Sequence, residues 1–225
     1  MEAGRGDILA VVGMTREAKI LPGAPVLVGG GAAASLAGAL EVELSHRPAG
    51  VVSFGLCGAL DPHLRVGDLV IGRGVIAGDE YIEADRDWAA RLFQLLPDVK
   101  VGDFTGAERP VAQPCEKAEM RARTGADAVD LESAIVARAA RWFGAPFAVV
   151  RAVSDAADRV LPHAAQVGLG PDGRPALGAV LGSLRANPWQ LGSLIRTALE
   201  AEDAFHALER ARHLLGPRLA GPEAI

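Results

Sequence analysis

Apolar and polar positions follow one another along the chain in blocks that predict strands alternating with helices. Short runs that are mostly apolar predict buried strands, and they cover residues 8–12, 25–28, 51–54, 68–71, 126–129 and 147–153. Residues 99–105, which alternate apolar with polar positions, are a further candidate strand. Segments with helical spacing lie at residues 32–45, 83–95, 116–123, 132–143 and 189–215. This alternation predicts an α/β fold with a largely parallel sheet.

The periodic pattern weakens between residues 159 and 188, where glycines and prolines accumulate. Such residues indicate turns, so this segment is predicted to be a lid or a surface excursion. A chain of 225 residues suits one domain with a full core. We therefore expect a single domain over residues 1–216 and a flexible tail over residues 217–225.

Composition and charge argue against several classes of protein. The formal net charge is −5 and no basic face is visible, so nucleic acid is not an expected partner. Cys57 and Cys115 form no C-x-x-C pair, which indicates reduced thiols, no metal site and a cytoplasmic protein. Neither a signal peptide nor an uncharged run of about 18 apolar residues is visible.

Three acidic residues are candidates for chemistry. Glu132 and Asp155 lie at predicted strand ends, where open α/β sheets bind ligands, so both carboxylates could share one pocket. Structural roles explain them about equally well, Glu132 as a charge at a helix start and Asp155 as a helix N-cap. Glu17 follows the first strand, and its simplest interpretation is a solvated residue at a helix start.

Two glycine-rich turns follow predicted strands. Gly29, Gly30 and Gly31 loosely fit a dinucleotide-binding fingerprint, but the acidic residue expected after the next strand is missing. Their backbone N–H groups could instead hold a ribosyl or phosphate group, or the turn could be purely structural. The second turn contains Cys57 and Gly58, whose small size would let a ligand lie against the backbone.

Four motifs carry a resemblance to a known family, and the last three are specific in their order and spacing. They are V-V-G-M-T-R-E-A at residues 11–18, S-F-G-L-C-G-A-L-D-P-H-L-R-V-G-D-L-V at 53–70, A-V-D-L-E-S-A at 128–134 and V-V-R-A-V-S-D-A-A-D at 149–158. Together they resemble the purine nucleoside phosphorylase and methylthioadenosine/S-adenosylhomocysteine nucleosidase superfamily. A-E-R-P-V at residues 107–111 and the long C-terminal region after residue 162 are most similar to its hopanoid-associated phosphorylase subgroup.

This resemblance implies a three-layer α/β sandwich around a mixed, partly barrel-like sheet, and cleavage of a bond between ribose and a purine. Carried over, Asp155 would protonate or hydrogen-bond N7 of the leaving adenine. Glu132 would hold the ribose hydroxyls, and Glu17 would orient and activate water. Positioned proton transfer of this kind is typically worth about 10²–10⁴-fold in rate.

The resemblance also implies contacts to the nucleoside. Leu131 would pack on the ribose, Val111 would contact the base, and Arg151 would lie beside Glu17. Small residues would form the floor and the turn of the pocket, namely Gly29, Gly31, Cys57 and Gly58.

Departures from the family favour water over phosphate as the acceptor. Phosphorylases hold phosphate partly with an arginine and a serine, at places that Ser53 and Leu56 occupy here. Phosphate would have to rely on the first glycine turn, Arg16 or Arg151. No cofactor is implied, although inorganic phosphate stays open as a co-substrate.

The subgroup implies adenosylhopane, a lipid-linked nucleoside, as the substrate, with peripheral contact at the inner membrane surface. A soluble methylthioadenosine or S-adenosylhomocysteine nucleosidase is the second hypothesis. A non-catalytic nucleotide-binding module is a hypothesis of another class. The family commonly forms dimers or larger rings, so a homodimer or a higher homo-oligomer is expected.

Overall fold

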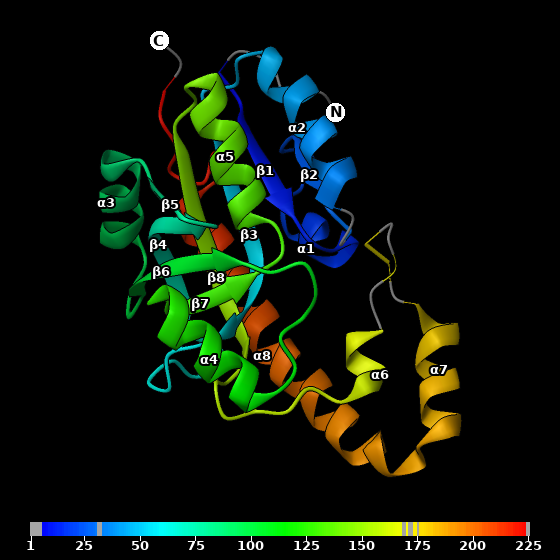
Figure 1. Cartoon of the computed structure of the whole chain (residues 1–225). Coiled ribbons are helices and arrows are strands. Elements are labelled where there is room, and N and C mark those ends of the chain that lie inside the picture. The colour runs from blue at the N-terminus through cyan, green and yellow to red at the C-terminus, as the bar shows by residue number, and fades with distance from the viewer. Residues whose placement is uncertain (1–5, 31–32, 168–169, 171–172, 175, 224–225) are drawn as a thin grey trace.

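A mixed, partly closed sheet forms the centre of the molecule (Figure 1). The structure is a computed structural model that describes residues 6–30, 33–167, 170, 173–174 and 176–223. The strands within these residues are β1 (Ile8–Val12), β2 (Val26–Val28), β3 (Gly50–Ala59), β4 (Leu69–Ala77), β5 (Glu80–Glu83), β6 (Lys100–Gly106), β7 (Ala128–Asp130) and β8 (Phe147–Asp155). Their order is β2-β1-β3-β7-β6-β4-β5, and β8 pairs with both β3 and β4, which closes part of the sheet into a ring.

Helices cover both faces of this sheet. They are α1 (Thr15–Ile20), α2 (Ala33–Ser45), α3 (Arg86–Leu95), α4 (Pro114–Thr124), α5 (Ser133–Phe143), α6 (His163–Gln166), α7 (Leu177–Ala186) and α8 (Leu191–Leu215). Leu36, Leu40 and Leu44 recur every four residues on α2 and pack with α5 against one face. Trp88 of α3 and Phe205 of α8 are buried against the other face. The predicted three-layer α/β sandwich is therefore confirmed.

The strand directions bring distant parts of the chain together. β1, β3 and β8 run parallel, so their carboxyl ends share one edge. The sheet is less parallel than the apolar runs predicted, because β7 pairs antiparallel with β3, and β4 pairs antiparallel with β5 and β8. Gly58 consequently has Val129 on one side and Asp155 on the other.

Two elements differ from their predicted bounds for clear physical reasons. β3 continues through the predicted second glycine turn, so Cys57 and Gly58 belong to a strand. Gly55 allows this continuation, because its φ of 152° is a conformation that other residues rarely adopt. The helix predicted over residues 83–95 is confirmed from Arg86 onward. Its first residues differ because Glu83 ends β5 and Asp85 caps α3 by accepting a hydrogen bond from the Trp88 amide.

The C-terminal part of the chain has more structure than its pattern predicted. α6 and α7 occupy much of the segment that was predicted to be a lid or a surface excursion. Beyond α8, Leu219 is 1% exposed, and its carbonyl accepts a 2.9 Å hydrogen bond from the Trp88 indole N–H. The prediction of a flexible tail does not hold around Leu219, because this segment packs against α3.

Candidate active site

A cavity of about 300 Å³ opens at the edge where β1, β3 and β8 end. Its wall includes the start of α1, the end of β3, the loop at residues 107–111, the β7–α5 junction and the end of β8. α6 and α8 complete it. The predicted site residues on this wall are Glu17, Cys57, Gly58, Val111, Leu131, Glu132, Arg151 and Asp155.

Arg151 organises one part of the wall, together with three carboxylates. It is 1% exposed, and its Nη2 donates to Glu132 Oε2 at 3.0 Å and to Ser53 Oγ at 2.6 Å. Its Nε lies 3.2 Å from Asp130 Oδ2. Burial acts to lower the pKa of this guanidinium, but Asp130, Glu132 and Glu17 raise it, so Arg151 stays charged. We call Glu17, Asp130, Glu132 and Arg151 the arginine cluster.

Glu17 is fixed by backbone donors. Its Oε2 accepts hydrogen bonds from the amides of Gly13 and Met14, both at 2.8 Å, and its Oε1 accepts one from the Leu56 amide at 2.7 Å. Burial raises the pKa of Glu17, against the lowering effects of Arg151 and these amides. The side chain is 1% exposed, so the interpretation as a solvated residue at a helix start is wrong.

Glu132 immediately precedes α5, and its side chain lines the cavity instead of capping the helix. Asp130 takes over the cap, because its Oδ1 accepts from the amides of Glu132 at 2.9 Å and Ser133 at 2.7 Å. Burial raises the pKa of Glu132 to about 7; Arg151 opposes this shift, while Asp130 and Glu17 add to it. The carboxyl group therefore titrates near neutral pH.

Asp155 is the last residue of β8 and forms a different ion pair. Its Oδ2 lies 2.5 Å from Nζ of Lys117, a residue of α4 whose side chain is 1% exposed. Its Oδ1 lies 2.9 Å from the hydroxyl of Ser154. The alternative that Asp155 is a helix N-cap is wrong, because the next helix, α6, begins eight positions later.

Glycines allow the backbone to approach these carboxylates closely. A Cβ on Gly58 would lie 3.1 Å from Asp155 Oδ2, and a Cβ on Gly29 would lie 3.1 Å from Glu132 Cγ. Gly58 lines the cavity, whereas Gly29 borders a smaller neighbouring hollow that also includes Glu132. The structure therefore places Gly29 beside the main cavity and not on its wall, and Gly31 lies outside the described residues.

The sequence interpretation missed three residues that hold this site together. Asp130 and Ser133 lie within A-V-D-L-E-S-A, and an aspartate just before a helix is an ordinary capping signal that could have identified Asp130. Lys117 lies in E-K-A-E-M-R-A-R, a run that is typical of a solvated helix face. No pattern distinguishes this lysine from its charged neighbours.

The two ion-pair systems give the cavity wall two chemical characters. The arginine cluster combines three carboxylates with one guanidinium, which suits hydroxyl donors and a centre that becomes positively charged. The Lys117–Asp155 pair combines one carboxylate with one ammonium and presents Asp155 to the cavity. A ligand between them would meet carboxylate groups from both.

Comparison with models of known families identifies the superfamily of the chain. The model of the Phosphorylase superfamily matches residues 13–183. The chain belongs to the Phosphorylase superfamily. Membership of the Phosphorylase superfamily makes it an enzyme that cleaves N-glycosidic bonds, as the sequence predicted. No curated protein matches the chain.

Solved structures share the fold of this Phosphorylase superfamily member. The 5′-methylthioadenosine/S-adenosylhomocysteine nucleosidase of Campylobacter jejuni has a TM-score of 0.62 and 16% identity, over 91% of this chain and 99% of that chain. S-adenosylhomocysteine nucleosidase from Streptococcus pyogenes, in complex with 5-methylthiotubericidin, has a TM-score of 0.63 and 18% identity, over 93% and 97%. A futalosine hydrolase mutant of Helicobacter pylori has a TM-score of 0.59 and 16% identity, over 68% of this chain and 92% of that chain.

Proposed function

We propose that the protein hydrolyses the bond between adenine and ribose in an adenosyl nucleoside. The observation that carries this proposal is the convergence of Glu17, Glu132 and Asp155 on one cavity. Breaking the bond develops positive charge on the sugar and moves the bonding electron pair into the base. Carboxylates of the arginine cluster would stabilise the sugar, while Asp155 would protonate the base.

The charge of the arginine cluster supports water as the acceptor. Arg151 already donates to Glu132, to Ser53 and to the Leu56 carbonyl. Arg16, the other cation considered for phosphate, lies 2.5 Å from a carboxylate oxygen of Glu202. A phosphate dianion would therefore meet more carboxylates than free cations, whereas a neutral water can give its proton to Glu17.

The far wall of the cavity supports a large apolar group on the 5′ carbon. Leu161, Ala165, Ala201 and Phe205 line it from α8 and from the segment around α6. We propose adenosylhopane, a lipid-linked nucleoside, as the substrate. Methylthioadenosine or S-adenosylhomocysteine is the alternative, and the names of the solved nucleosidases favour it.

A hairpin formed by α7 and the first half of α8 supports contact with the inner membrane surface. It extends away from the sheet (Figure 1), and its exposed apolar residues are Leu177, Leu181, Trp189, Leu191, Ile195 and Leu199. The charged residues between positions 177 and 199 are Arg185 and Arg196, and Arg196 pairs with Glu200 at 3.1 Å. An apolar surface with cations suits anionic lipid. Among the described residues, no helix meets the length and apolarity that crossing a membrane requires.

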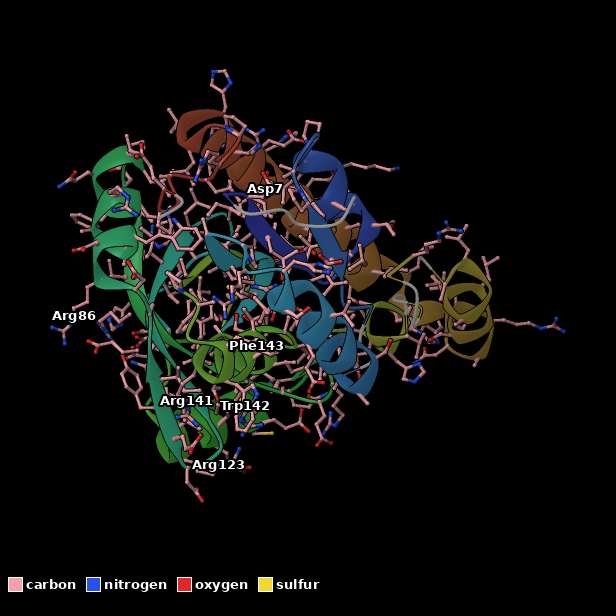
Figure 2. All side chains as sticks on the ribbon, turned by 90° about the horizontal axis from the view of Figure 1, so that it is seen from above. Asp7, Arg86, Arg123, Arg141, Trp142 and Phe143 are labelled. Carbon is pink, nitrogen blue, oxygen red and sulfur yellow. The ribbon has the colours of Figure 1, made fainter. Side chains whose placement is uncertain are left out.

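A second copy of the chain is the proposed protein partner. Trp142 and Phe143 lie at the end of α5 on the outer surface (Figure 2), and they are 86% and 38% exposed. Exposed aromatic side chains of this kind are typical of contact surfaces. Sedimentation velocity should show a dimer for the wild type and a larger monomer fraction for Trp142→Ala. Identical profiles would contradict the use of this surface.

Adenine release tests the function directly. The substrates are adenosylhopane, methylthioadenosine and S-adenosylhomocysteine, each with and without inorganic phosphate. We expect release from adenosylhopane without phosphate, and its loss in Asp155→Asn and Glu132→Gln. Strict dependence on phosphate would refute hydrolysis, and release from the small nucleosides alone would refute the lipid-linked substrate. Full activity in both variants would refute the site.

A further inference from the structure

Lys117 is a buried cation for which the proposed chemistry has no role. Its Nζ lies 2.5 Å from Asp155 Oδ2, 2.7 Å from the Ala156 carbonyl and 3.4 Å from the Arg159 carbonyl. These contacts occupy its three N–H donors. Asp155 lines the cavity, whereas Lys117 does not, so any effect of Lys117 on a ligand must pass through Asp155.

Stability alone explains this lysine poorly. Lys117 lies near the start of α4, where the helix dipole disfavours a positive charge. Both members of its ion pair are buried, with side-chain exposures of 1% and 8%. A buried ion pair commonly stabilises a fold no better than apolar residues of similar size. The position next to the cavity therefore indicates a role in the chemistry of Asp155.

We propose that Lys117 is a positioning residue that prepares the Asp155 carboxyl group for proton transfer to the leaving base. The proposal rests on the proposed function. Lys117 engages Oδ2, so Oδ1, which lies 2.9 Å from the Ser154 hydroxyl, is the oxygen that delivers a proton to the cavity. A charge-assisted hydrogen bond of this length holds the carboxyl plane in one orientation.

Proton transfer accompanies cleavage of the bond to the leaving base. As the bond between C1′ and N9 breaks, its electron pair moves into the adenine ring, and the proton of Asp155 Oδ1 forms the N7–H bond. Asp155 becomes a carboxylate beside the Lys117 ammonium, which stabilises the new negative charge. Water forms the new bond to C1′ and gives its proton to Glu17. Glu17 then releases this proton to solvent and Asp155 takes one proton back, so each turnover consumes one water and leaves the ammonium of Lys117 intact.

Two substrates with different leaving groups distinguish a role of Lys117 in proton transfer from a purely structural role. Adenine needs a proton to leave, whereas 4-nitrophenolate leaves 4-nitrophenyl β-D-ribofuranoside without one. Lys117→Met removes the charge and keeps much of the side-chain length. We expect kcat for adenine release to fall about 10²-fold, within the range of general acid catalysis, while KM and 4-nitrophenolate release stay near wild-type values. Lys100→Met, at an exposed lysine of β6, is the matched control and should change neither rate.

The measured rates distinguish a failure of the proposed role of Lys117 from a failure of the proposed function. Equal losses on both substrates, or no loss on either, would overturn the role of Lys117. Lys117→Gln, whose amide can donate to Asp155, gives the same comparison if Lys117→Met does not fold. Adding Lys117→Met to Asp155→Asn should lower adenine release no further, and an additive loss would also overturn the role. A wild-type protein that releases no adenine from any adenosyl nucleoside would refute the proposed function itself.

Discussion

The Glu132 carboxyl group should make the stability of the fold depend on pH within a defined window. Its pKa is about 7 in the fold, against an ordinary value of 4.5. Below pH 4.5 the group is protonated in both states, and its full contribution to stability is present. As pH rises through 7, the folded state must ionise a buried carboxyl group, and that contribution is lost. A difference of 2.5 pKa units corresponds to about 3 kcal/mol.

Urea unfolding measured between pH 4.5 and 8 for the wild type and Glu132→Gln tests this expectation. The variant removes the titrating group and keeps its size. The free energy of unfolding of the wild type, relative to the variant, should therefore fall on the order of 3 kcal/mol across this window. Glu119→Gln, at an exposed glutamate of α4, should follow the wild-type curve. If the difference in the free energy of unfolding between the wild type and Glu132→Gln stays constant with pH, the reasoning is refuted.

Two further predictions concern Gly55 and the cysteines. In Gly55→Ala the new Cβ would lie 2.7 Å from Glu17 Cδ, at a φ of 152°. The free energy of unfolding should therefore fall by about 1–3 kcal/mol, and adenine release should fall with it. Gly23→Ala, at a φ of 79° with open space around it, is the control for backbone strain alone. In a native thiol titration, exposed Cys115 should react at once. Burial raises the pKa of the Cys57 thiol, which should react only after denaturation, and rapid reaction of both would contradict the buried position.

The strands were predictable because their signals are local, whereas the roles of the three acids came from the resemblance to a known family. Apolar runs identify buried strands whatever their partners, and the position of Asp155 after such a run placed it at a strand end. The resemblance placed Arg151 beside Glu17, but the ion pairs of Asp155 and Glu132 were not predictable. Lys117 is 38 residues from Asp155, and Arg151 is 19 residues from Glu132. Such ion pairs depend on how the sheet closes, which no local pattern encodes.

The same limit explains the wrong strand end at the second glycine turn. Glycines after an apolar run usually mark a turn, and Cys57 and Gly58 were assigned to one. In the fold, β3 has β8 on one side and β7 on the other at Gly58, and these long-range pairs maintain the strand. Tertiary pairing thus overrides the local preference for a turn.

Closure of the sheet is what assembles the candidate site. The register that places Val129 and Asp155 on opposite sides of Gly58 brings the β7–α5 junction and the end of β8 to the same cavity. The carboxylates of the arginine cluster would repel one another there without Arg151. Arg151 pairs in register with Gly55, where a Cβ would lie 3.0 Å from its Nη1, so the absence of a side chain makes room for the guanidinium. The glycines of β3, the arginine of β8 and the acids therefore depend on one another for the assembly of this cavity wall.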